Sequence, residues 1–93
     1  MNTFDQISIR IIKQQELIIG PVAWDEARKV SGLTIIDIKT EKISFTSEAK
    51  DVVNRLVSQY ERLFGRASKE VCREAVQDLI AEIPADQIPS SLQ

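Results

Sequence analysis

The chain has 93 residues, of which 43% are hydrophobic and 28% are charged, and its formal net charge is −2. This composition is typical of one folded domain with a charged surface, and the negative balance disfavours a nucleic-acid-binding protein. One cysteine cannot form an internal disulfide, and the lack of histidine removes the commonest general base and metal ligand.

No apolar run approaches the roughly 20 residues that span a bilayer, and Met1–Asp5 lacks the basic flank and apolar stretch of a signal peptide. We therefore expect a cytoplasmic protein that stays out of the membrane. We further expect that it is not an enzyme and holds no cofactor or metal.

The structure expected for the first element depends on an apparent internal repeat. Arg10–Arg28 aligns with Arg55–Arg73 without a gap, and a window of this length gives about one identity by chance. The identical pairs are Arg10/Arg55, Gln14/Gln59, Glu16/Glu61, Gly20/Gly65 and Arg28/Arg73. The alternative is a chance match, because any two amphipathic helices share a pattern. A true duplication predicts two helix-turn-helix units, residues 2–31 and 47–83.

Residues 3–19 are expected to form a helix. By itself, Ile7–Ile11 alternates between apolar and polar residues like a strand, and isoleucine favours sheets. The aligned residues 48–64, however, carry a wide apolar stripe at three- and four-residue spacing, which is typical of a helix. The positions of 3–19 that align with this stripe are mostly apolar too, so the repeat favours a helix over a strand.

The sequence also predicts where these helices begin and end. Asn2 and Ser47 fall at equivalent positions, and both suit the cap of a first helical turn. Ile9 and Leu17 lie off the apolar stripe and predict a second buried side. Gly20 suits the left-handed turn after the first helix, and Pro21 suits the first turn of the next, which we expect over residues 22–30.

A β-hairpin is expected between the two units. Residues 34–38 and 42–45 are rich in β-branched residues and predict two strands, joined by a turn at 39–41. An isolated hairpin is marginal in water, so it must pack on the helices or on another copy of the chain. Because two-fold dimers are the commonest oligomers, we expect a homodimer.

The second unit is expected to end in a long helix. Gly65 takes the place of Gly20, and Ser68 offers a cap for a helix whose apolar side continues to Ile83. Pro84 ends this helix, and we expect residues 84–93 to be a partly ordered tail after a single globular domain of residues 1–83.

Trp24 and Cys72 are single residues of their kind. Trp24 is expected either to anchor the core or, if it is exposed, to contact a partner. Cys72 falls on an apolar stripe, and no histidine exists to activate its thiol. We therefore interpret it as a small buried hydrophobe rather than a nucleophile.

A basic set forms the other candidate site. Its members, Arg55, Arg62, Arg66, Lys69 and Arg73, would align on one side if the helix ran on through Gly65, and could then meet phosphates. Carboxylates are interleaved with them, for example at the four-residue spacing of Arg66 and Glu70, so a salt-bridged surface is the simpler interpretation. Acidic pairs such as Glu70/Glu74 and Asp78/Glu82 are interpreted as solvated helix faces.

These observations predict an α+β fold, mostly helical, with two helix-turn-helix units flanking a β-hairpin. Leu63–Ala67 and Ile18–Ala23 resemble short helical pieces at the ends of bacterial signalling proteins, which implies no particular activity. The function we expect is a non-enzymatic protein–protein interaction or dimerisation module, such as a regulatory subunit in bacterial signalling. The alternative is a nucleic-acid-binding regulator that uses a helix-turn-helix unit and the arginine stripe. A small enzyme would need a pocket with convergent polar groups, which the sequence does not reveal.

Overall fold

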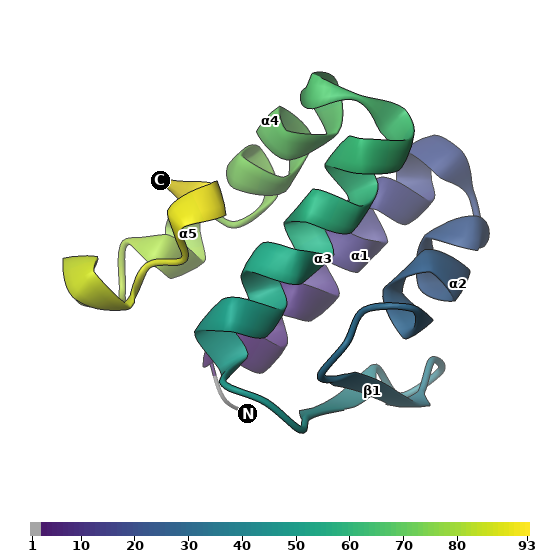
Figure 1. The fold of residues 1–93 in the computed structure, drawn as a ribbon, viewed down its shortest axis with the longest axis horizontal. Helices are drawn as coiled ribbons and strands as arrows, with labels where there is room; N and C mark the ends of the chain where they lie inside the picture. The colour runs from purple at the N-terminus through teal and green to yellow at the C-terminus, as the bar shows by residue number, and fades with distance from the viewer. Residues whose placement is uncertain (1–2) are drawn as a thin grey trace.

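Two pairs of helices, a β-hairpin and a C-terminal segment make up the protein (Figure 1). The structure is a computed structural model that describes residues 3–93. The helices are α1 (Thr3–Ile19), α2 (Val22–Arg28), α3 (Ala49–Phe64), α4 (Arg66–Ala75) and α5 (Gln77–Ile80), with β1 (Leu33–Asp37), β2 (Lys42–Phe45) and the 3₁₀ turns η1 (Ala85–Gln87) and η2 (Ser90–Leu92). The expected mostly helical α+β class is confirmed.

The isoleucine-rich N-terminal segment is a helix. Ile7, Ile11 and Ile12 of α1 are fully buried, because their three- and four-residue spacing places them on one helical face. Packing of this face against the rest of the chain therefore overrides the strand preference of isoleucine. Of the two expected caps, Asn2 lies outside the described residues. Ser47 is not the cap, since α3 begins after Glu48 without a side-chain hydrogen bond at its start.

Helices α1 and α3 lie side by side and run in the same direction (Figure 1). Their buried faces correspond position by position across the offset of the aligned segments. The buried residues are Ile7, Ser8, Ile11, Ile12 and Gln15 in α1, and Val52, Val53, Leu56, Val57 and Tyr60 in α3. Ile9 is also buried, as expected, but Leu17 is 80% exposed, so the second buried side of α1 stops short of its end. Duplication as the origin of this correspondence stays a prediction.

The hairpin packs on the helices of its own chain. Leu33 pairs with Phe45 and Ile35 with Ile43, and the register shifts between Ile35 and Asp37. The first strand therefore starts and ends one residue earlier than expected. Leu33 and Ile43 are buried, whereas Ile36 is 60% exposed. Leu33 and Ile43 are thus buried without a second copy of the chain, which weakens the argument that predicted a dimer.

The second helical pair differs from the sequence-based expectation. Gly65, at φ 92° and ψ 177°, separates α3 from α4, so the helix does not run on. Ser68 is a buried residue inside α4 rather than its cap. The long helix expected to reach Ile83 is also interrupted at Val76, where φ is −121°, and only the short α5 follows.

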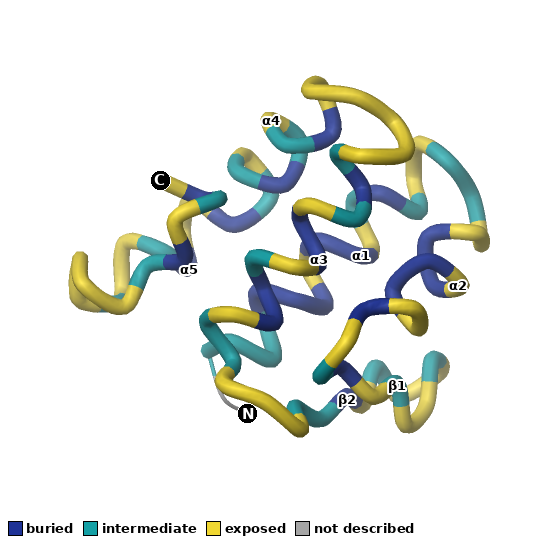
Figure 2. Tube along the Cα trace, viewed as in Figure 1, coloured by how far each residue is buried: buried dark blue, intermediate teal, exposed yellow. Residues whose placement is uncertain are grey.

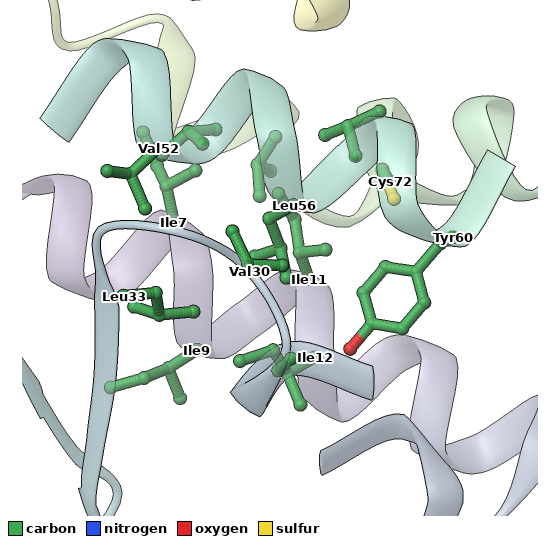
Figure 3. Close-up of a cluster of buried hydrophobic side chains, with 14 of the residues drawn as sticks. Ile7, Ile9, Ile11, Ile12, Val30, Leu33, Val52, Leu56, Tyr60 and Cys72 are labelled. Carbon is green, nitrogen blue, oxygen red and sulfur yellow. The ribbon is translucent and has the colours of Figure 1, made fainter. Parts of the chain in front are cut away.

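Part of the C-terminal segment packs on the helices. Pro89 and Leu92 are buried, and η2 lies against both α3 and α4. Residues 84–87, 90 and 93 are exposed, and the expectation of a partly ordered tail stays a prediction. In Figure 2 this segment and the hairpin flank α3 on opposite sides. Figure 3 shows the core between the helices, where Leu56 and Ile11 meet and Ile9 lies near Leu33. No helix among residues 3–93 has both the length and the apolar character to cross a membrane.

Candidate interaction surface

Cys72 is a buried structural thiol, in agreement with the interpretation of its sequence position. Its side chain is fully buried, and Gln15 Nε2 donates to Cys72 Sγ over 3.4 Å. Burial raises the pKa of the thiol to about 11, because the thiolate would lose its hydration there. At neutral pH the group is therefore protonated and shielded, which is the opposite of an activated nucleophile.

Trp24 belongs to the core. Its side chain is 4% exposed, and its indole Nε1 donates to Glu16 Oε2 over 3.0 Å. The core-anchor alternative therefore applies, and the exposure on which a partner contact at Trp24 depended is absent. The indole instead ties α2 to the end of α1, next to Gly20.

The five basic residues do not form one stripe. The break at Gly65 places Arg55 and Arg62 on α3, and Arg66, Lys69 and Arg73 on the separate helix α4. The salt-bridged surface expected for them is also mostly absent, since Arg73 is the only one with a carboxylate partner among residues 3–93. That partner is Glu70, at 3.1 Å, rather than the expected pairing of Glu70 with Arg66.

The remaining basic residues bind neutral groups or face solvent. Arg55 donates to the Ser31 carbonyl over 3.0 Å, and Arg62 donates to Gln59 Oε1 over 2.7 Å. Within the described part of the chain, the side chains of Arg66 and Lys69 have no hydrogen-bond or ion-pair partner. Arg62, Arg66 and Lys69, which lie near Gly65 in the sequence, therefore have no ion-pair partner among residues 3–93.

The largest exposed apolar side chains gather where the two long helices end. We call these residues the apolar end: Leu17, Ile18, Val22, Leu63 and Phe64. They flank Gly20 and Gly65, and Figure 1 shows both helix ends at the same end of the molecule. Exposed fractions run from 38% for Val22 to 80% for Leu17. Sequence reasoning missed this surface because Ile18, Leu63 and Phe64 continue the apolar stripes that are buried elsewhere.

Two open grooves lie on the outward faces of the long helices. One, of about 420 Å³, runs along α1, and the other, of about 510 Å³, runs along α3. Most of the residues that line them are polar, and Arg10 and Arg55 occupy equivalent positions in them. In the α1 groove the cations are neutralised, since Arg10 pairs with Asp78 and Lys13 with Glu41, each at 2.9 Å. The α1 groove thus offers paired charges, whereas Arg55 and Arg62 in the α3 groove donate to neutral oxygens.

Glu26 of α2 is a buried carboxylate. Gln59 Nε2 donates to it over 2.9 Å and Lys29 Nζ over 3.1 Å. These two hydrogen bonds lower the pKa of the carboxyl group, because they stabilise its charged form. Glu26 therefore links α2 to α3 as a satisfied structural group.

Among residues 3–93, no cluster of three or more potential metal-ligating side chains is found. Comparisons with protein-family models, with curated proteins and with solved structures gave no significant match.

Proposed function

We propose that this protein is a non-enzymatic protein–protein interaction module and that the apolar end is its contact surface. The observation that carries the proposal is the gathering of large exposed apolar side chains at one end of the molecule. Scattered apolar residues are normal on a protein surface, but grouped ones favour an interaction site. Leu17 and Ile18 are consecutive, and both are more than half exposed.

The partner that we propose is a second copy of the chain. Ile18 and Leu63 occupy equivalent positions at the ends of α1 and α3, so the surface has two similar halves. A surface of this kind suits an isologous contact, in which the same patch serves on both subunits. The setting that the sequence suggests is cytoplasmic, with the module acting as a regulatory subunit in bacterial signalling.

Two matched substitutions test the surface. Ile18, at the apolar end, and Ile36, on the hairpin, are the same residue type with nearly equal exposed fractions, 59% and 60%. We expect sedimentation of the wild-type chain at tens of micromolar to show a dimer. Ile18→Glu should weaken dimerisation at least tenfold, because the interface would bury an unpaired charge. Ile36→Glu should leave the dimer unchanged.

The reverse pattern would locate the interface on the hairpin, as the sequence alone suggested. A wild-type monomer would exclude the second copy as partner and would direct the search to an unlike protein. Circular dichroism of both variants controls for folding. Because Ile36 is exposed and outside the proposed interface, Ile36→Glu should not alter the melting temperature appreciably, whereas Ile18→Glu should lower it only by the stability that the dimer adds.

A nucleic-acid-binding regulator is the second candidate. The observation that favours it is that Arg62, Arg66 and Lys69 lack carboxylate partners among residues 3–93. Against it stands the break at Gly65, which divides the basic set between two helices. DNA affinity that survives Ile18→Glu but is lost on Arg66→Ala would favour this candidate.

A further inference from the structure

The C-terminal segment lies on the helices in the way that a bound peptide would. Pro89 and Leu92 bury their side chains, and Leu92 belongs to the hydrophobic core. Asn54 Oδ1 accepts hydrogen bonds from both the backbone N–H and the hydroxyl of Ser91, over 3.0 and 2.6 Å. Lys50 Nζ donates to the Asp86 carbonyl over 2.7 Å. Two apolar side chains and two polar contacts therefore hold residues 86–92.

Among residues 3–93, the backbone of this segment forms no strand ladder with another element, and its bonds to the helices are made through the side chains of Asn54 and Lys50. Its backbone–backbone hydrogen bonds in the described chain close single turns, such as Leu92 N–H to the Pro89 carbonyl and Gln87 N–H to the Pro84 carbonyl. The hairpin, by contrast, has a strand ladder, and Thr46 N–H bonds to the Gly32 carbonyl beside it. The C-terminal segment can consequently leave its place without breaking a ladder or a helix.

The two covering segments occupy corresponding places. Asn54 of α3 is the counterpart of Ile9 of α1 in the aligned segments. Ile9 lies near Leu33 of the hairpin (Figure 3), and Asn54 holds Ser91 of the C-terminal segment. The hairpin thus packs on the first helical pair, α1 and α2, where the C-terminal segment packs on the second, α3 and α4. The first pair is covered by a self-supported hairpin, whereas the second is covered by a short segment held through side chains.

We propose that the face of α3 and α4 beneath Pro89 and Leu92 is a peptide-binding surface, and that residues 88–92 (Ile-Pro-Ser-Ser-Leu) occupy it as an internal ligand. The partner that it fits is a segment of another protein with the same pattern, in which a serine stands two residues after a proline and a leucine follows that serine directly. Proline restricts the free segment before binding, which lowers the conformational entropy lost on docking. Asn54 would recognise the serine through the hydrogen bonds that it now makes to Ser91, and the hydrophobic core would recognise the leucine through the site that Leu92 now fills.

The attached segment competes with any such partner. A tethered ligand acts at an effective concentration of the order of millimolar, so the intact chain should bind a free peptide weakly. Weakening the attached segment should then expose the surface. The inference does not depend on the apolar end, because η2 lies against α3 and α4 away from the ends at Gly20 and Gly65 (Figure 1).

A peptide of residues 84–93 with a fluorescent label tests the proposal by anisotropy. We expect the full-length Leu92→Ala chain to bind the wild-type peptide at least tenfold more tightly than the wild-type chain does. A peptide carrying Leu92→Ala should not bind, and Asn54→Ala introduced into the Leu92→Ala chain should weaken binding of the wild-type peptide. Equal binding, or no binding, by two folded chains would overturn the proposal.

Amide exchange in the wild-type chain gives an independent test, which also serves if Leu92→Ala fails to fold. We expect the Ser91 N–H to exchange at least tenfold faster than the core amide of Val57, because the segment opens without global unfolding. Equal exchange rates at Ser91 and Val57 would mean that the segment leaves only when the whole domain unfolds, and the proposal would fail.

Discussion

Gln15 and Tyr60 occupy equivalent positions in α1 and α3, and each donates a hydrogen bond to the short helix of the opposite pair. Gln15 Nε2 donates to the Ser68 carbonyl over 3.1 Å, and Tyr60 Oη donates to the Ala23 carbonyl over 2.6 Å. Ser68 and Ala23 are themselves equivalent positions in the aligned segments. The two bonds are thus reciprocal, and they join the two helical pairs into one core.

Tyr60→Phe tests one side of this relationship. The substitution keeps the ring in the core but leaves the Ala23 carbonyl without the hydroxyl donor, so we expect a loss of about 0.5–1.5 kcal/mol in the free energy of unfolding. Urea titration measures this loss. A variant as stable as the wild type would mean that the bond between Tyr60 and Ala23 adds nothing to folding.

The helical stripes could be read from the sequence because their burial follows local spacing. Leu56 and Val57 mark the buried face of α3, and their counterparts Ile11 and Ile12 mark that of α1. The comparison of two aligned segments supplied what propensity alone did not, since isoleucine spacing around Ile7 suits a strand as well.

The features that were missed depend on contacts distant in sequence. Val76 continues a helical pattern, yet α4 ends before it, and nothing in the local residues marks that break. Leu17 is apolar and was expected to belong to a second buried side of α1, but no other element among residues 3–93 packs over it and its side chain is 80% exposed. The C-terminal segment has two prolines and few apolar residues, so its sequence did not predict that Ser91 would bond to Asn54 or that Leu92 would join the core.

The stability of the protein should fall in alkaline solution. Burial raises the pKa of Cys72 from an ordinary value near 9 to about 11, and it also raises that of Tyr60. Above pH ~9 the unfolded chain loses the Cys72 proton first, so stability that is fully present below pH ~9 decreases up to pH ~11. The shift corresponds to about 2–3 kcal/mol.

Urea titrations between pH 8 and 11 measure this decrease. Cys72→Ala should make the decrease smaller, because only the Tyr60 contribution remains. An identical pH dependence in Cys72→Ala and wild type would show that the thiol is not responsible. A thiol reagent at neutral pH should likewise react with Cys72 far more slowly in the folded chain than in urea.

Ser8→Ala should stabilise the protein. Ser8 is fully buried in α1, and its hydroxyl is without a hydrogen-bond partner in the described structure. Removing the hydroxyl relieves its desolvation cost and adds the better helix propensity of alanine, together about 1 kcal/mol. Ser58→Ala, at an exposed position of α3, is the control and should gain only the propensity part. A loss of stability in Ser8→Ala would mean that the hydroxyl has a partner, such as a buried water.

Substitutions at Gly65 should be costly for every L-residue. Its backbone, at φ 92° and ψ 177°, lies in a region that essentially only glycine adopts, so asparagine loses the advantage that it has in a left-handed helical turn. A Cβ at Gly65 would meet no atom within 4 Å, which leaves backbone strain as the cause. We expect Gly65→Asn and Gly65→Val each to lose about 1–3 kcal/mol in denaturant melts. A tolerated Gly65→Asn would show that the turn relaxes to the left-handed helical conformation.

Duplex DNA should bind weakly to the chain, with a Kd no tighter than about 10⁻⁵ M at physiological salt, the range of non-specific binding. The turn at Gly65 separates the basic residues of α3 from those of α4, and Arg73 is already paired with Glu70. The four members of the basic set without carboxylate partners among residues 3–93, Arg55, Arg62, Arg66 and Lys69, could release few counterions, so the logarithm of affinity should fall with the logarithm of salt concentration with a slope no steeper than about −4. Anisotropy of a labelled duplex across a salt series measures both quantities. A sub-micromolar Kd with a steeper slope would require the two helices to present their cations to one phosphate backbone, and it would make the nucleic-acid regulator the better proposal.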